Sequence, residues 1–193
     1  MILIDDQIQE YTPEEIARWT DELPEWRRKQ VLAYKNDMGR RQSLLAYRLL
    51  CQGLREEYGI MEQPTFVYNE HGKPSLALPP TGGDGEGLYF SLSHCKEGVC
   101  CAISDRPVGI DIESANRQIS DSVIRYSMNE GEQALIRESD DPQRTFLRLW
   151  TQKEAVLKRL GTGIRDDMRD ILSDHAYTIE VRENERYILS VAW

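Results

Sequence analysis

The chain has no apolar run that approaches the ~20 residues a membrane-spanning helix needs. Its first ten residues include Asp5, Asp6 and Glu10 but no basic residue, so they lack the form of a secretion signal. From these two absences we expect a cytoplasmic protein with no membrane partner.

Cysteine is scarce and unevenly spaced. The four cysteines are Cys51, Cys95, Cys100 and Cys101, and their spacing is typical neither of a zinc site nor of a disulfide framework. Cys100 and Cys101 are neighbours in an expected strand, so their side chains should point to opposite faces. We expect all four to be reduced and to pack as small apolar side chains.

Positive charge is in deficit too. The net charge of −9 argues against nucleic-acid binding. The glycine-rich segment 79–87 lacks the Gly-Lys-Ser/Thr ending of a nucleotide-binding P-loop, so no phosphate role is assigned to it. Basic residues are nevertheless frequent between Arg18 and Arg55, which suggests an anionic ligand or an acidic partner. For most of these side chains a solvated helix surface is the better explanation.

The remaining composition is that of a globular protein, with 40% hydrophobic and 30% charged residues in 193 positions. That length allows one domain or two small packed ones. Periodicity and turn signals predict helices and then strands in the first half, and the same order again in the second half. The expected helices begin at 13, 25, 37 or 38, 121, 130 and 142, and the expected strands cover 65–68, 88–93, 99–104, 108–113, 177–181 and 187–193.

This order predicts an α+β fold with two similar lobes, although no sequence identity between the halves is visible. The polar stretch 114–120 carries no pattern of its own. We therefore expect an N-terminal lobe over residues 1–113 and a C-terminal lobe over residues 114–193.

The segment Gly109-Ile110-Asp111-Ile112-Glu113 alternates apolar and acidic residues. In a strand, Ile110 and Ile112 would enter the core while Asp111 and Glu113 share the other face. Two neighbouring carboxylates repel unless a cation lies between them, and Mg²⁺ prefers oxygen ligands. The pattern alone, however, is better explained by a strand with a solvated acidic face.

The segment 150–158 reads Trp-Thr-Gln-Lys-Glu-Ala-Val-Leu-Lys. On a helix Trp150, Glu154 and Lys158 form one stripe, so Glu154 could add a third carboxylate and Lys158 could neutralise phosphate. Read in isolation, this is better explained as an ordinary exposed Glu–Lys pair worth ~0.3 kcal/mol.

Two further segments carry weaker signals. Ser93 and His94 end the run Phe-Ser-Leu-Ser-His and could donate hydrogen bonds to a phosphate; a turn serine and a surface histidine are the alternative. In Gly72-Lys73-Pro74 the proline favours an extended Lys73, which could aim its ammonium at a phosphate.

Taken together and in this order, the four segments resemble the 4′-phosphopantetheinyl transferases, specifically the two-lobed type that activates surfactin-like peptide synthetases. The resemblance runs from Lys35 to Gly163. The shorter, trimeric holo-synthase type fits less well, because its acidic strand lies near the N-terminus. The resemblance implies two α+β lobes related by pseudo-two-fold symmetry, with coenzyme A between them, and we expect a monomer.

The resemblance also implies roles for individual residues. Asp111, Glu113 and Glu154 would hold Mg²⁺. Glu154 and Lys158 would be catalytic, with Glu154 preferred as the base, and Glu132 would have a less defined role. The residues that would bind coenzyme A are Lys35, Arg40, Arg41, Lys73, Ser93, His94, Lys153 and Lys158. The choice between Arg40 and Arg41 for the 3′-phosphate stays open.

One departure is Cys95, where the family usually has Ser or Thr. The implied reaction transfers 4′-phosphopantetheine from coenzyme A to a serine of an acyl or peptidyl carrier protein and releases 3′,5′-ADP. A non-catalytic module that binds coenzyme A or a carrier, and a magnesium phosphohydrolase, are the alternatives. The sequence leaves open which carrier is modified.

Overall fold

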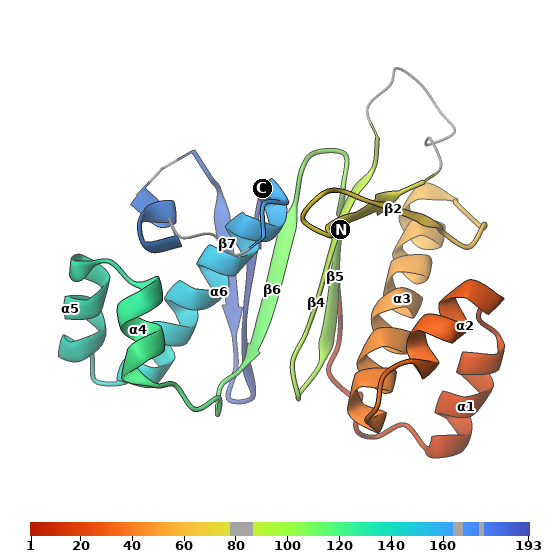
Figure 1. Ribbon diagram of the computed structural model, residues 1–193, viewed down its shortest axis with the longest axis horizontal. Coiled ribbons are helices and arrows are strands. Elements are labelled where there is room, and N and C mark those ends of the chain that lie inside the picture. Colours follow the sequence, from red (N-terminus) through yellow and green to blue (C-terminus); the bar gives the residue numbers. More distant parts are fainter. Residues whose placement is uncertain (78–86, 164–167, 174–175) are drawn as a thin grey trace.

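A computed structural model of the chain describes residues 1–77, 87–163, 168–173 and 176–193 (Figure 1). Most of the expected loop 79–87 lies outside these residues. In the first half the elements are β1 (Ile2–Asp5), α1 (Pro13–Asp21), α2 (Glu25–Leu32), α3 (Asp37–Tyr58), β2 (Phe66–Tyr68), β3 (Pro74–Leu76), β4 (Tyr89–His94) and β5 (Val99–Ser104). The second half contains β6 (Gly109–Ser114), α4 (Asp121–Ser127), α5 (Glu130–Glu138), α6 (Pro142–Leu160), the 3₁₀ helix η1 (Met168–Ser173), β7 (Ile179–Glu183) and β8 (Tyr187–Ala192).

The predicted helix boundaries have clear local causes. Thr12 and Glu15 form a capping box at the start of α1, and Asn36 caps α3 through a bond from the Gly39 N–H. Gly59 and Gly161 take left-handed conformations that end α3 and α6. Capping residues and helix-ending glycines of this kind can be recognised in a sequence, which helped to make the α+β class predictable.

The strands form two three-stranded antiparallel sheets, in the orders β1-β5-β4 and β6-β8-β7, and a separate β2-β3 hairpin. In each half of the chain, the strand that precedes the helices (β1 or β6) pairs with the last strand of that half (β5 or β8). The two sheets therefore share one topology, with β1, β4 and β5 corresponding to β6, β7 and β8.

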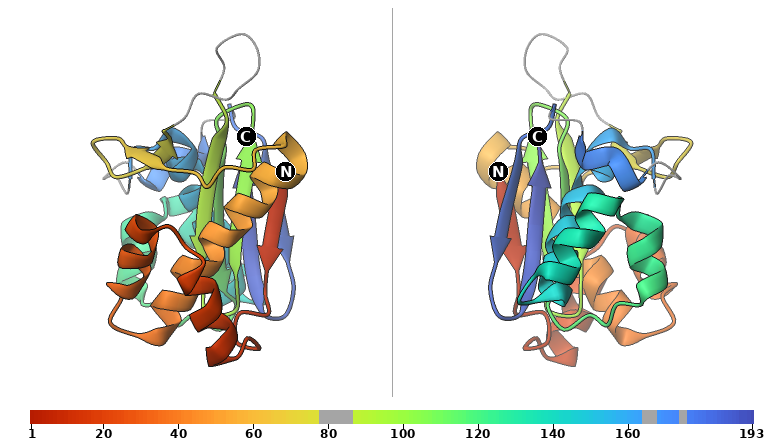
Figure 2. Two further views of the ribbon diagram at one scale, coloured as in Figure 1. Left: turned by 90° about the vertical axis from the view of Figure 1, so that its right-hand side faces the viewer. Right: turned by 90° about the vertical axis from the view of Figure 1, so that its left-hand side faces the viewer.

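The two sheets lie between the two long helices, as Figures 1 and 2 show. Apolar side chains of α3 pack with Phe90, Cys101 and Ile103 on one face of the first sheet. The other face of that sheet packs Cys100 and Ala102 against β6 and β8 of the second sheet. The predicted placement of Cys100 and Cys101 on opposite faces is thus confirmed, and all four cysteines are free thiols.

Serine side chains join the two sheets. The Ile110 N–H donates to Ser91 Oγ at 3.1 Å, and the Ile112 N–H donates to Ser93 Oγ at 3.4 Å. On the far side of β6, a Cβ at Gly109 would clash with backbone atoms of Ala155 and Arg159, so glycine is what lets α6 lie directly on this strand. β6 is consequently held between β4 and α6.

Two strands were not anticipated. β1 and β3 have four and three residues, too few to show a two-residue alternation. β1 is also apolar on both faces, since Leu3 packs towards α3 while Ile2 and Ile4 pack towards the second sheet. The pairing of β6 with β8 favours a lobe boundary before Gly109, and the division after residue 113 stays a prediction.

Candidate active site

The acidic face of β6 meets the stripe of α6 that carries Trp150, Glu154 and Lys158. Asp111 is 5% exposed, and its Oδ1 accepts hydrogen bonds from Lys158 Nζ at 2.7 Å and Ser93 Oγ at 2.8 Å. Lys158 Nζ also donates to Ser93 Oγ at 2.7 Å. Three elements, β4, β6 and α6, thus converge on one partly buried ion pair. Burial lowers the pKa of Lys158, but the charge and hydrogen bond of Asp111 outweigh burial and leave that pKa raised.

Two carboxylate oxygens at this place have no hydrogen-bond partner among the residues that the structure describes. They are Asp111 Oδ2 and Glu154 Oε1, and both are buried. Burial, with the charge of Asp111 adding to it, raises the pKa of Glu154 to about 7. Buried polar atoms are normally satisfied, so two unpartnered oxygens on neighbouring carboxylates indicate a place for a cation.

Glu113 is more fully engaged. Its Oε1 accepts from Trp150 Nε1 at 3.2 Å and from Arg117, whose guanidinium also lies over the Trp150 ring. Burial and then the negative charge of Asp111 raise the pKa of Glu113, as expected for neighbouring carboxylates. Arg117 is a site residue that the sequence did not reveal, because it lies in the stretch interpreted as an unpatterned linker.

The donor set fits Mg²⁺, which takes carboxylate oxygens and keeps several waters. Asp111 and Glu154 each present a free buried oxygen. Among the described residues, no three His, Cys, Asp or Glu side chains are already arranged as a metal-binding group. Arg117 and Trp150 both bind Oε1 of Glu113, so its Oε2 is the oxygen that could join the other two carboxylates.

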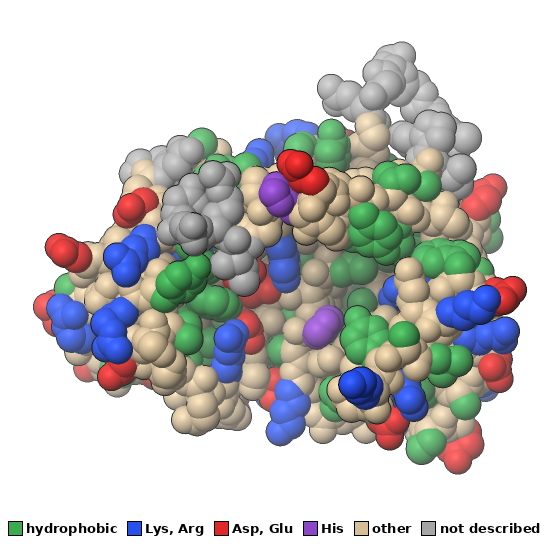
Figure 3. Space-filling model, in the orientation of Figure 1, with side chains coloured by type: hydrophobic (Ala, Val, Ile, Leu, Met, Phe, Trp, Pro, Cys, Tyr) green, Lys and Arg blue, Asp and Glu red, His purple; other side chains and the backbone are tan. Residues whose placement is uncertain are grey.

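A cavity of about 300 Å³ lies beside these carboxylates. Figure 3 shows the hollow between the two halves, with acidic and basic side chains in it. The first half contributes Lys73, and α6 contributes Glu154 and Lys158. The full lining consists of His71, Gly72, Lys73, Pro74, Phe90, Ser91, Leu92, Glu154, Leu157, Lys158, Gly161 and Gly163. Three of the four segments singled out in the sequence therefore line this cavity, and the fourth, around Asp111, touches it through Lys158.

His94 and the basic start of α3 lie outside the cavity lining. Burial and the nearby charge of Lys158 lower the pKa of His94. Arg40 Nε donates to Tyr34 O at 2.9 Å, and Arg41 NH1 donates to Tyr11 O at 2.7 Å. Lys35 is exposed. The bond from Gln42 Nε2 to Cys95 O, 2.8 Å long, places the start of α3 beside the end of β4.

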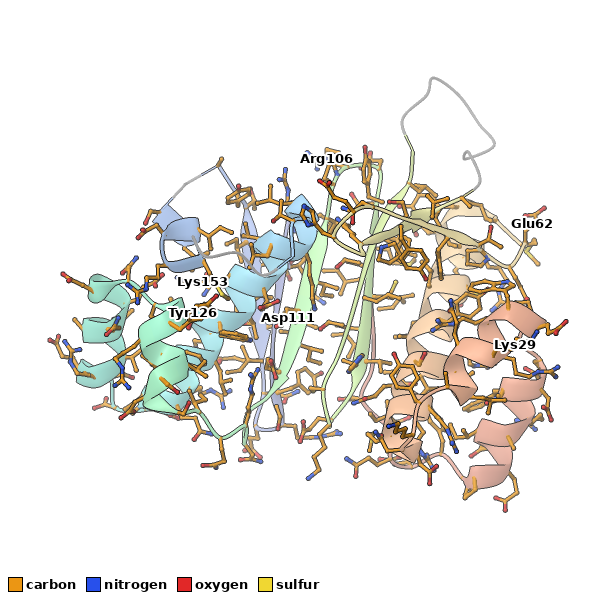
Figure 4. The ribbon with its side chains drawn as sticks, viewed as in Figure 1. Lys29, Glu62, Arg106, Asp111, Tyr126 and Lys153 are labelled. Atoms are coloured by element: carbon orange, nitrogen blue, oxygen red, sulfur yellow. The ribbon has the colours of Figure 1, made fainter. Side chains whose placement is uncertain are left out.

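Lys153 is not part of this site. It is fully buried, and its Nζ donates to Glu132 Oε2 at 2.7 Å and to the backbone oxygens of Ser127, Met168 and Arg169. In Figure 4 it lies towards Tyr126 on α4, away from Asp111. The expectation that Lys153 contacts the diphosphate stays a prediction, and its burial argues against it, because Lys153 is one residue from Glu154 and so occupies a different face of α6.

We expect Lys153→Met to destabilise the protein by roughly 3–5 kcal/mol, because it leaves the carboxylate of Glu132 buried without its charge partner. Adding Glu132→Gln should recover part of that loss by removing the unpaired charge. Urea unfolding of the two variants measures both effects. Wild-type stability of Lys153→Met combined with lost coenzyme A binding would show that Lys153 is a ligand after all.

The chain is similar in sequence to a known enzyme superfamily. Residues 107–191 match the sequence model of the 4′-phosphopantetheinyl transferase superfamily, a region that contains Asp111, Glu113, Glu154 and Lys158. Among the described residues no helix is both long and apolar enough to cross a membrane.

Three relatives illustrate the similarity. The 4′-phosphopantetheinyl transferase psf-1 of Bacillus pumilus is 33% identical over 127 residues, covering 64% of this chain and 52% of the relative. AcpT of Salmonella typhi is 35% identical over 63% of this chain and 60% of its own length. Sfp of Bacillus subtilis (strain 168) is 32% identical over 51% of this chain and 42% of its own length. The chain spans about half the length of the relatives it matches, and the resemblance to this superfamily is confirmed.

Proposed function

We propose that this relative of the 4′-phosphopantetheinyl transferases moves the phosphopantetheine group of coenzyme A onto a serine of a carrier protein. The observation that carries the proposal is the pair of unpartnered buried oxygens on Asp111 and Glu154. Glu154 lines a cavity to which Lys73 and Lys158 bring positive charge, and Asp111 is bound to Lys158. Carboxylates for a divalent cation and lysines for phosphate are what a diphosphate substrate requires.

The metal ligands in this proposal are Asp111, Glu113 and Glu154. Mg²⁺ bound there would neutralise negative charge on the diphosphate. Lys158, already held by Asp111 and Ser93, is positioned to stabilise charge on the departing side of the phosphoanhydride. Ser93 has its hydroxyl engaged on both sides, so its role here is to orient Lys158 rather than to bind the nucleotide.

In the transfer step, the carrier serine oxygen forms a bond to the phosphorus on the pantetheine side of coenzyme A. The bond between that phosphorus and the bridging oxygen breaks, and 3′,5′-ADP leaves with the electron pair. Glu154 accepts the serine proton in our assignment. Glu113 and a bound water are the other candidates; Glu132 is bound by the buried Lys153, which argues against it.

We also propose an arrangement of two similar lobes. The matching strand orders β1-β5-β4 and β6-β8-β7 support two lobes related by a pseudo-two-fold axis, with coenzyme A between them. We place the lobe boundary before Gly109, since β6 pairs with β8. A monomer is expected, because one chain already supplies both lobes, and a location in the cytoplasm stays a prediction.

Labelled coenzyme A, incubated with Mg²⁺ and apo-carrier proteins from fatty-acid, polyketide and peptide synthesis, tests the proposal. A transferase moves the label onto at least one carrier. Binding of coenzyme A without transfer to any carrier would instead favour a binding module, and release of phosphopantetheine to water without a carrier would favour a phosphohydrolase.

We predict that coenzyme A lacking its 3′-phosphate binds more weakly than coenzyme A. Basic residues at the start of α3 are suited to this dianion. If Arg40 or Arg41 contacts the 3′-phosphate, replacing that arginine with Ala should reduce the difference in affinity between coenzyme A and coenzyme A without its 3′-phosphate. Calorimetry with both ligands measures this difference. If neither variant alters the preference, the phosphate lies elsewhere.

A further inference from the structure

The turn between β2 and β3 in the first half reaches across to the end of α6 in the second half. Asn69 Nδ2 donates to the backbone oxygen of Gly161 at 2.8 Å, and Lys73 Nζ donates to that of Arg159 at 3.0 Å. These two bonds link residues 92 and 86 positions apart in the chain. We call the pair the α6 clasp.

The clasp donates hydrogen bonds to backbone carbonyl oxygens that have no partner within the helix. The last carbonyls of a helix have no intrahelical partner, and the negative end of the helix dipole favours a cation. Gly161 N donates to Leu157 O at 2.8 Å, while the oxygens of Arg159 and Gly161 take their hydrogens from the clasp. The ammonium of Lys73 therefore acts as a charged cap on α6.

Asn69 is held rigidly for this role by its own turn. Its Oδ1 accepts from the His71 N–H at 3.0 Å and from the Lys73 N–H at 2.8 Å, which leaves the Nδ2 group free to point at α6. The fit at the other side is close, because a Cβ at Gly161 would lie 2.8 Å from Lys73 Cδ and 3.3 Å from Asn69 Nδ2. Gly161 also has a φ of +72°, which a residue with a side chain rarely adopts.

The clasped end of α6 is the end that carries Lys158 and Glu154. Lys158 is three residues before Gly161, and Lys73, Lys158 and Gly161 all line the same cavity. A small shift of this helical turn would move Lys158 away from the ion pair with Asp111. Misplacement of a catalytic group by about 1 Å can cost roughly 10²-fold in rate.

From these contacts we infer that Asn69 is a positioning residue: it anchors the last turn of α6 and thereby sets Lys158 and Glu154 for transfer. The inference rests on the proposed function for its catalytic consequence. Asn69 does not line the cavity, so its effect on the reaction runs through α6 and not through contact with coenzyme A. The capping role of Lys73 is separate from the phosphate contact that the sequence suggested.

The test compares two variants of Asn69. Asn69→Asp keeps an oxygen for the turn but presents a second oxygen to the carbonyl of Gly161. Asn69→Ser keeps a turn-forming acceptor and is too short to reach α6. Glu70→Gln is the matched control, since Glu70 belongs to the same turn, is exposed and has its carboxylate beside the His71 ring.

Both Asn69 variants should increase amide hydrogen exchange in the last turn of α6 by about three- to tenfold, as expected for one lost hydrogen bond. Single-turnover transfer should fall by roughly tenfold or more, while the coenzyme A dissociation constant changes much less. Glu70→Gln should match the wild type in all three measurements.

Unchanged exchange at the end of α6 in both Asn69 variants would overturn the inference. So would lowered stability with an unchanged transfer rate, because Asn69 would then be merely structural. If the wild type transfers nothing, the proposed function has failed; hydrogen exchange then decides whether the clasp holds α6, and the positioning role in transfer falls with the function.

Discussion

Asp111→Ala is expected to abolish phosphopantetheine transfer, a loss of at least roughly 10³-fold, while the fold remains intact. The substitution removes one of the two free buried carboxylate oxygens and the charge partner of Lys158. Mg²⁺ would then lack one of its ligands, so the negative charge of the diphosphate would be poorly neutralised. Lys158 would also lose the carboxylate that holds it. Initial rates of transfer to an apo-carrier measure this effect.

Asp105→Ala is the matched control, because Asp105 is exposed and its contacts with Ser104 and Arg106 are long, at 3.3 and 3.9 Å. It should transfer at the wild-type rate. Asp111→Asn separates charge from shape, since it keeps the side-chain volume but loses the negative charge. Circular dichroism and thermal unfolding would show that each variant is folded. Wild-type activity in folded Asp111→Ala would remove Asp111 from the site.

Glu154→Gln should lower turnover by ~10²–10⁴ with a smaller effect on coenzyme A affinity, as expected for loss of a general base. Glutamine keeps the shape and one oxygen but cannot accept the proton. Lys158→Ala should instead weaken both binding and rate, because its charge acts on the ground state and on the transition state.

Single-turnover transfer at saturating carrier, with coenzyme A binding measured separately by calorimetry, distinguishes these cases. Equal losses of binding and rate in Glu154→Gln would make Glu154 a metal ligand only. The base would then be Glu113 or a bound water. Glu132 is a weaker candidate, since its carboxylate is bound by the buried Lys153.

The sequence predicted those parts of the site whose geometry is local. Alternation along β6 put Asp111 and Glu113 on one face, and the four-residue spacing put Glu154 and Lys158 on one stripe of α6. Both follow from a single element. That the face and the stripe meet depends on the packing of α6 over Gly109, which only the fold supplies.

The contacts that could not be predicted from the sequence join residues that are distant in the chain. Lys153 and Lys158 are both lysines of one helix, yet one is buried among backbone oxygens and the other faces Asp111. Ser93 suggested a phosphate contact, but its hydroxyl joins β4 to β6 and Lys158. Asn69 carried only a turn signal. In each case the decisive neighbour belongs to another element.

The most direct test of the account is mass spectrometry of an intact apo-carrier protein after incubation with the wild-type chain, coenzyme A and Mg²⁺. The account predicts that the carrier gains the mass of one phosphopantetheine group, and that excess EDTA prevents the gain. An unmodified carrier across the fatty-acid, polyketide and peptide-synthetase types, or full modification in the presence of EDTA, would contradict it.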